Sequence, residues 1–192
     1  IGDAGAEDAK IVFDGNAQDY HIGLDDSADT LVIGKGSALG TTTSMSFDAN
    51  GIITKPLQPA FQVRPSSQQN SLATNTVLAF GTEVFDNNAD FSSNTFTAPV
   101  TGKYQINAQL RIDGADQAAS YNRIYMESSN RFYEVIYDHG KLSGDPAYWQ
   151  MNINVLADMD ANDTLFLKWS QSGGSNQAAA TTSCVFSGYL VC

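Results

Sequence analysis

Hydrophobic and polar residues alternate along much of the chain, and this pattern predicts β-strands. A period of two residues is typical of a strand that buries one face. The segments 147–157 and 163–171 alternate in this way, and no segment shows the period of an amphipathic helix. The clearest case is 103–112, KYQINAQLRI, where one face carries Tyr104, Ile106, Ala108, Leu110 and Ile112, and the other carries Gln105, Asn107, Gln109 and Arg111.

Turn residues divide the chain after residue 58 into nine predicted strands. Pro and Gly are the strongest local breakers of regular structure. The sharpest corner is FTAPVTGKYQI (96–106), where Pro99 and Gly102 separate two runs of β-forming residues. Short strands separated by turns predict an all-β antiparallel sandwich or jelly roll. The predicted strands are 59–64, 76–85, 94–98, 102–112, 121–128, 131–138, 147–157, 163–171 and 183–191.

The first 58 residues have shorter strands and few aromatic side chains. The units VFDGN and SFDANG form a loose repeat, and Asp14-Gly15 is a hairpin-type turn signal. Strands this short and polar gain stability when chains wrap around one another. We therefore expect a β-rich, oligomer-dependent shaft or neck over 1–58 and a separate domain over 59–192, with Pro56 and Pro59 at the boundary. The predicted shaft strands are 10–16, 20–26, 30–36 and 44–51.

The composition narrows the class of partner. The chain has 10 Lys and Arg against 21 Asp and Glu, a net charge of −11, which argues against binding to nucleic acid or anionic membranes. Only 16% of residues are charged, so amides and hydroxyls must dominate the surface, as in extracellular structural β proteins. No apolar run approaches the length of a membrane span. Because the first residue is Ile1 and not Met, we expect a fragment or a processed product.

Both cysteines lie near the end of the chain, at Cys184 and Cys192. On one strand they would be eight residues apart at roughly 3.3 Å per residue, too far for a disulfide within the chain. Two interpretations stay open, namely free buried thiols and an interchain disulfide at a symmetry axis. Neither fits a disulfide-stapled secreted module.

No catalytic motif stands out, and the sequence predicts a protein that is not an enzyme. HExxH, CxxC and GxSxG are all missing, and the two histidines, His21 and His139, lie in different regions. His139 is the one candidate base after residue 58, and a polar loop histidine is the favoured interpretation. A dispersed Ser-His-Asp triad and a pair of glycosidase carboxylates remain open from sequence alone.

Four acidic residues in predicted loops are candidate ligands for calcium. Carboxylate oxygens are the ligands that this ion prefers. Solvated turn residues are the favoured interpretation, so the sequence predicts no cofactor and leaves calcium as the alternative. The four residues are Asp113, Asp116, Asp138 and Asp145.

Five motifs occur in a fixed order after residue 58, namely PAFQV (59–63), VLAFGTEVFDN (77–87), FTAPVTGKYQI (96–106), NDTLFLKW (162–169) and CVFSGYLV (184–191). This set resembles the globular head of the complement C1q and tumour-necrosis-factor superfamily. The resemblance covers residues 59–191 and departs from the family at Asn162, where Gly is usual, and at Tyr189, where Phe is usual. It implies a ten-stranded jelly roll, a tight homotrimer and no catalysis.

The first 58 residues are similar to repeats found upstream of such heads in tail-fibre proteins of bacteriophages, especially marine ones. No Gly-X-Y repeat occurs, so a collagen stalk is excluded. The similarity implies a virion fibre, located on the extracellular virion surface, that contacts other virion proteins through its N-terminal side and attaches to a host surface glycan or protein receptor. The alternatives are a structural head-fibre, collar or decoration protein, a secreted bacterial adhesin or filament subunit, and a fibre-borne glycan hydrolase.

We expect the binding surface on loops at the outer end of the head, because loops carry function on a rigid scaffold. Exposed aromatic side chains near acids and amides suit contact with sugars. An alternative for Tyr148 and Trp149 is a place in the core or in a trimer interface. The candidate residues are Tyr137, Asp138, His139, Tyr148 and Trp149.

Overall fold

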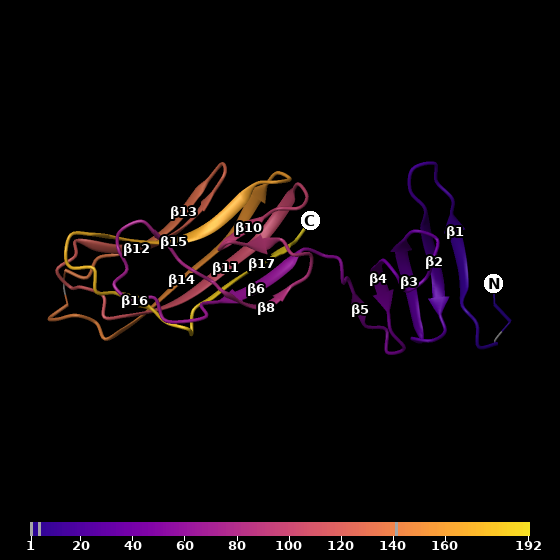
Figure 1. The fold of residues 1–192 in the computed structure, drawn as a ribbon, viewed down its shortest axis with the longest axis horizontal. Coiled ribbons are helices and arrows are strands. Elements are labelled where there is room, and N and C mark those ends of the chain that lie inside the picture. The colour runs from indigo at the N-terminus through magenta and orange to yellow at the C-terminus, as the bar shows by residue number, and fades with distance from the viewer. Residues whose placement is uncertain (1, 4, 141) are drawn as a thin grey trace. The chain divides into compact units, whose positions relative to one another are not determined.

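The computed structural model describes residues 2–3, 5–140 and 142–192, and the regular structure in this part of the chain is entirely β-strand (Figure 1). The chain divides into two compact units, Ile1–Gln58 and Pro59–Cys192. We call them the N-terminal unit and the head. Within the described ranges, no helix has the length and apolar character needed to cross a membrane.

The N-terminal unit is one antiparallel sheet whose five strands follow one another in chain order. All four predicted runs form strands, and a fifth, two-residue strand completes the sheet. Asp14-Gly15 lies in the loop between the first two strands, which is longer than the two-residue hairpin turn that its sequence indicates. A hydrogen bond from Gly15 N to the Asp19 carboxylate, 3.1 Å long, stabilises this wider turn. The strands are β1 (Ala9–Phe13), β2 (Tyr20–Asp25), β3 (Thr30–Lys35), β4 (Thr43–Phe47) and β5 (Ile53–Thr54).

The head is a jelly-roll sandwich of two six-stranded sheets, which confirms the predicted fold class (Figure 1). The first sheet has the order β14-β11-β17-β6-β8, with β16 paired to β11, and comprises β6 (Ala60–Arg64), β8 (Thr82–Asp86), β11 (Gly102–Asp113), β14 (Tyr148–Met159), β16 (Ala179–Ala180) and β17 (Val185–Leu190). The second has the order β13-β12-β15-β10-β9, with β7 paired to β15, and comprises β7 (Thr76–Val77), β9 (Phe91–Ser92), β10 (Thr95–Thr97), β12 (Tyr121–Ser128), β13 (Phe132–Tyr137) and β15 (Thr164–Ser172).

The strand predicted over 76–85 is not continuous. It is two separate strands, β7 and β8, so this prediction was wrong. The chain leaves the second sheet after β7 and enters the first sheet at β8. Between them Leu78 and Phe80 are buried, and Phe80 N donates to the Asn94 side chain at 2.8 Å. Leu78 and Phe80 are two residues apart and both buried, which gives the sequence the alternating pattern of a strand. The segment that carries them instead crosses from one sheet to the other.

The corner at 96–106 joins β10 of the second sheet to β11 of the first. Tyr104 is fully buried, and its hydroxyl donates to the Val100 carbonyl at 2.7 Å, which fixes the turn. A Cβ at Gly102 would lie 2.6 Å from the Cys192 carbonyl oxygen, so only glycine lets the C-terminal segment pass this close. Behind the corner, Phe61 stacks on Phe96 with ring centroids 4.8 Å apart, at the centre of an aromatic core.

Strand register places the two ends of the head side by side. Leu190 N donates to the Pro59 carbonyl at 3.0 Å, next to the start of β11. The long antiparallel pair β11 and β14 runs from there to Asp113 and Tyr148 at the opposite end. The connections β11–β12, β13–β14 and β15–β16 therefore gather at the end of the head away from Pro59 and Leu190, which we call the loop end (Figure 1).

Candidate functional site

Two carboxylates tie the three connections of the loop end together. Asp145 accepts hydrogen bonds from Gln117 N and from the Gln177 side chain, both at 2.8 Å. Asp116 accepts from Ala118 N at 2.7 Å and from Ser175 N. The backbone bond from Gln117 is the main reason why the pKa of Asp145 is lowered, so this residue stays ionised and acts as a clamp.

Three of the predicted binding residues form an aromatic cluster beneath these loops. The Trp149 ring lies edge-on to Tyr137 and to His139, with centroid distances of 5.5 and 4.6 Å. His139 is 1% exposed, and the Asn122 side-chain amide donates to its Nδ1 at 2.6 Å. Burial lowers the pKa of His139, so the neutral ring is the accepting form near pH 7.

The other two predicted binding residues lie apart from this cluster. Tyr148 is 71% exposed on the outward face of the first sheet, where the Arg111 guanidinium sits 4.7 Å from its ring centroid. Asp138 is exposed and accepts from Gly140 N at 2.8 Å. The alternation along β14 separates Tyr148 from Trp149, because successive side chains point to opposite faces of a sheet. A binding role for these five residues stays a prediction.

The candidate calcium ligands do not converge. Asp113 pairs with Arg111 at 2.8 and 3.0 Å, and its hydrogen bond raises the pKa of that guanidinium. Asp116 and Asp138 each accept a backbone hydrogen bond within their own loops, and Asp145 accepts one from Gln117 in another loop. Among the described residues, no group of three or more His, Cys, Asp or Glu could hold a metal ion. The absence of a cofactor stays a prediction, with calcium binding as the alternative to be tested in solution.

Both cysteines are free. Cys184 is buried, and its Sγ donates to the Arg111 carbonyl at 3.4 Å. Burial also raises the pKa of this thiol, which makes it unreactive. Cys192 is exposed, so it is the one of the two that an interchain disulfide could use.

The outward face of the first sheet is a second candidate surface, which alternation predicted as polar but which the sequence did not single out for binding or assembly. We call it the open sheet face. Its centre is a polar hollow of about 310 Å³, and next to it Leu156 and Tyr189 are 58% and 50% exposed. These two side chains flank Gln105 in one row across the sheet. The polar side chains that line the hollow are Gln62, Asn107, Gln109, Asn152, Asn154 and Ser187.

The outward face of the second sheet is different, because charged groups cover it and are already paired. Arg123 bonds Glu134 at 3.0 Å and lies 4.7 Å from the Tyr125 ring centroid. Lys168 bonds Glu127 at 2.7 Å. On the open sheet face, by contrast, the paired charges of Arg111, Asp113, Lys103 and Asp158 lie at the ends of the long strands, and the middle is neutral.

Comparison with known proteins agrees with this architecture. The family model of the C1q domain matches residues 60–191. No curated protein matches. Among solved structures, the chain is similar to the globular domain of zebrafish complement 1qA protein, with a TM-score of 0.55, 15% identity, and coverage of 70% of this chain and 98% of that one. At this identity the likeness concerns the fold alone.

C1q domains are typically extracellular and generally serve as binding modules that form trimers. The match spans both sheets of the head, from β6 to β17, and includes the corner at Pro99 and Gly102. It covers more than half of the chain. The chain therefore belongs to the C1q domain family through its head.

Proposed function

We propose that this chain forms a homotrimer through the open sheet face, and that its three heads attach a virion fibre to a glycan or protein receptor on a host cell. The observation that carries the proposal is the open sheet face itself. It belongs to a C1q head, and C1q domains typically trimerise and bind ligands. The virion setting is supported by the resemblance of the first 58 residues to the repeats that precede fibre heads.

The chemistry of the two outer faces favours the open sheet face as the interface. The cores of protein interfaces are depleted in charge and enriched in aromatic residues. The middle of the open sheet face carries amides and a hydroxyl, with Leu156 and Tyr189 exposed beside them. Phe85, which is 45% exposed, extends the same face through its pairing with Gln62.

This assembly leaves the loop end available for a ligand. Asp138 and Leu142 are exposed there, as are Asp145 and Gln177. The Asp145 bonds and the aromatic cluster below them hold the loops in one conformation, and a preorganised surface loses less entropy on binding. Three such surfaces on one axis raise the apparent affinity by multivalency. The net charge of −11 favours a receptor that is not polyanionic.

The proposal is tested by the mass of the protein in solution and by its binding to host cells and to a glycan array. We expect three times the chain mass of 20.6 kDa and saturable binding. Asp138→Ala should weaken that binding, and the control Ile136→Ala, on the outward face of the second sheet, should not. A monomer contradicts the assembly. A trimer that binds neither cells nor glycans points to the purely structural virion role, and release of free sugar points to the hydrolase.

A further inference from the structure

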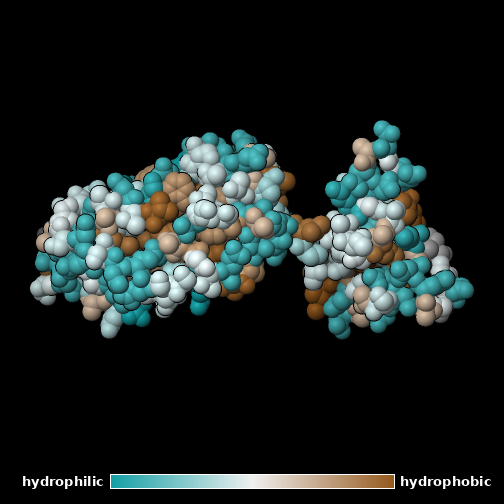
Figure 2. Space-filling view, viewed as in Figure 1, coloured by the Kyte–Doolittle hydropathy of each residue, from teal (hydrophilic) through white to brown (hydrophobic). Residues whose placement is uncertain are grey.

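The N-terminal unit has one apolar sheet face that is largely exposed, although Gly2, Gly5 and Glu7 of the same unit lie beside part of it. Strand pairing aligns Ile11, Ile22, Ile33 and Met45 in one row and Leu24 and Leu31 in the next. We call these two rows the apolar face. Leu24, Leu31 and Ile33 are 47%, 41% and 37% exposed. Figure 2 shows this unit with hydrophobic side chains, in brown, at its surface.

The opposite face of the same sheet is closed by the chain's own loop. Lys10 Nζ donates to the Ser37 carbonyl at 2.7 Å, and His21 Nδ1 lies 2.8 Å from the Gly36 carbonyl oxygen. A Cβ at Gly34 would lie 2.7 Å from the Thr42 carbonyl oxygen, so the loop packs directly on the strand. Val32 is buried there, at 2% exposed. The unit therefore covers its less apolar face and leaves the apolar one bare.

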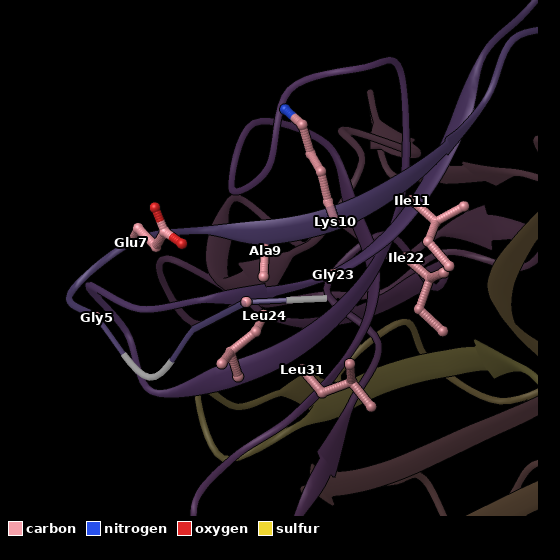
Figure 3. Close-up of a pocket in the computed structure, with 10 residues that line it drawn as sticks. Gly5, Glu7, Ala9, Lys10, Ile11, Ile22, Gly23, Leu24 and Leu31 are labelled. Carbon is pink, nitrogen blue, oxygen red and sulfur yellow. The ribbon is translucent and has the colours of Figure 1, made fainter.

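Figure 3 shows a hollow over the apolar face, bounded by Ala9, Ile22, Leu24 and Leu31. Its volume is about 380 Å³. The Lys10 side chain points away from these residues, and Glu7 stands at the edge of the hollow (Figure 3). The floor of the hollow therefore offers hydrocarbon and no charge.

A single sheet with one bare apolar face is marginal in water, because sheets gain stability by packing that face against another layer. We propose that the layer is the same face of two further copies of this chain. An uncharged apolar surface is complementary to itself. Stacked sheets pack about 10 Å apart, so neighbouring faces can close the hollows between them.

The covalent continuity of the chain favours copies of this chain over a foreign protein. This inference rests on the proposed head trimer. Only residues 55–59 separate β5 from β6. A short linker gives tethered partners an effective concentration in the millimolar range. Once three heads assemble, three apolar faces are held near one another, and a foreign protein would have to compete with them.

Cysteine cross-linking of the full chain tests the arrangement. In a Cys192→Ser background, one variant carries Ile33→Cys on the apolar face and the other carries Val12→Cys on the opposite face. Both positions are 37% exposed, so the two introduced thiols should be equally accessible to a maleimide in the isolated chain. With a short bifunctional maleimide we expect covalent dimers from Ile33→Cys, whereas Val12→Cys should stay monomeric on denaturing gels.

The outcomes separate this inference from the proposed function. A trimeric mass with no cross-linking at either position, or with equal cross-linking at both, overturns the pairing of the apolar faces and leaves the head trimer standing. A monomeric mass overturns both. To exclude misfolding as the cause, hydrogen exchange should show that β2 and β3 stay protected in each cysteine variant. In the trimer without cysteine substitutions, fast exchange of the β2 and β3 amides would show that their sheet is not packed against another layer. That result would also overturn the inference.

Discussion

At the scale of single residues, His139 links the stability of the head to pH. Its ring is buried and neutral, whereas the unfolded chain titrates at its ordinary pKa of 6.5. Because the folded pKa is lower, the unfolded state binds the proton first as the pH falls below 6.5. Stability should therefore drop from about pH 6.5 toward the folded pKa, by at most about 1.4 kcal/mol per pH unit for one proton.

Urea unfolding of the head at pH 7.5, 6.5 and 5.5 measures this slope. His139→Gln keeps a side chain that can bond Asn122 but removes the titration, so its slope should be shallower. His21→Gln, in the other unit, is the control and should leave the slope of the head unchanged. Asp138 opposes the effect of burial on His139, because a nearby negative charge favours the protonated ring. An identical slope in all three proteins would refute the assignment.

A second residue-scale prediction concerns Gly188 in β17. A Cβ there would lie 2.6 Å from Ile106 Cδ1 and 2.8 Å from the Phe61 ring. Gly188→Ala should therefore overpack the core and lower the free energy of unfolding by about 1–3 kcal/mol. Gly144→Ala is the matched control, because its Cβ would meet no atom within 4 Å. Equal denaturation midpoints for the two variants would contradict the packing argument.

The residue scale is also where the sequence was least informative about the site. Alternation could place Trp149 inward and Tyr148 outward once the strand was recognised. Nothing in the sequence could show that Tyr137, His139 and Trp149 meet, because they come from different strands and a loop. The Asp145 clamp was equally hidden, since its partners Gln117 and Gln177 lie in two other loops.

At the scale of elements, alternating strands were predictable, whereas two-residue strands were not. The strand predicted over 102–112 has the predicted inward and outward faces. The two-residue strands β9 and β16 are too short to carry a period. In the N-terminal unit the strands were predictable, but the apolar face was not, because it exists only once the pairing of β1, β2, β3 and β4 is known.

The loops of the head provide a prediction at this scale. Asp145→Ala removes the acceptor for Gln117 N and for the Gln177 side chain. We expect faster amide exchange in 114–120, with the strands of both sheets unchanged, because the clamp joins loops and not sheets. Asp160→Ala, in an exposed turn of the head, is the control. Exchange that is equally slow in 114–120 of both variants would show that Asp145 is not needed for order.

The calcium alternative is tested on the same loops. The candidate carboxylates already accept hydrogen bonds or pair with Arg111, so we expect EDTA to leave the exchange of 114–120 and the melting temperature unchanged. A calcium-dependent rise in melting temperature that Asp145→Ala abolishes would instead assign a site to this end of the head.

At the scale of the whole molecule, a substitution that prevents trimer formation should also lower the apparent affinity for cells. Leu156→Arg places a charge in the neutral region of the open sheet face, and we expect it to give monomers by light scattering. The loss of multivalency should then weaken apparent binding to cells by roughly 10²- to 10⁴-fold. Ile136→Arg is the matched control, since Ile136 is 50% exposed and lies on the other sheet. If the Leu156→Arg protein remains trimeric, the trimer interface does not lie on the open sheet face.

The adjacent ends of the head have a consequence for how such a protein changes over generations. Because Pro59 and Leu190 are hydrogen-bonded neighbours, the whole head enters and leaves at one place and projects its loops from the other. A single recombination crossover between residues 58 and 59 would exchange the complete head as a cassette. Under the proposed function, receptor preference would then shift in one genetic event, without any substitution in the core that folds the sandwich.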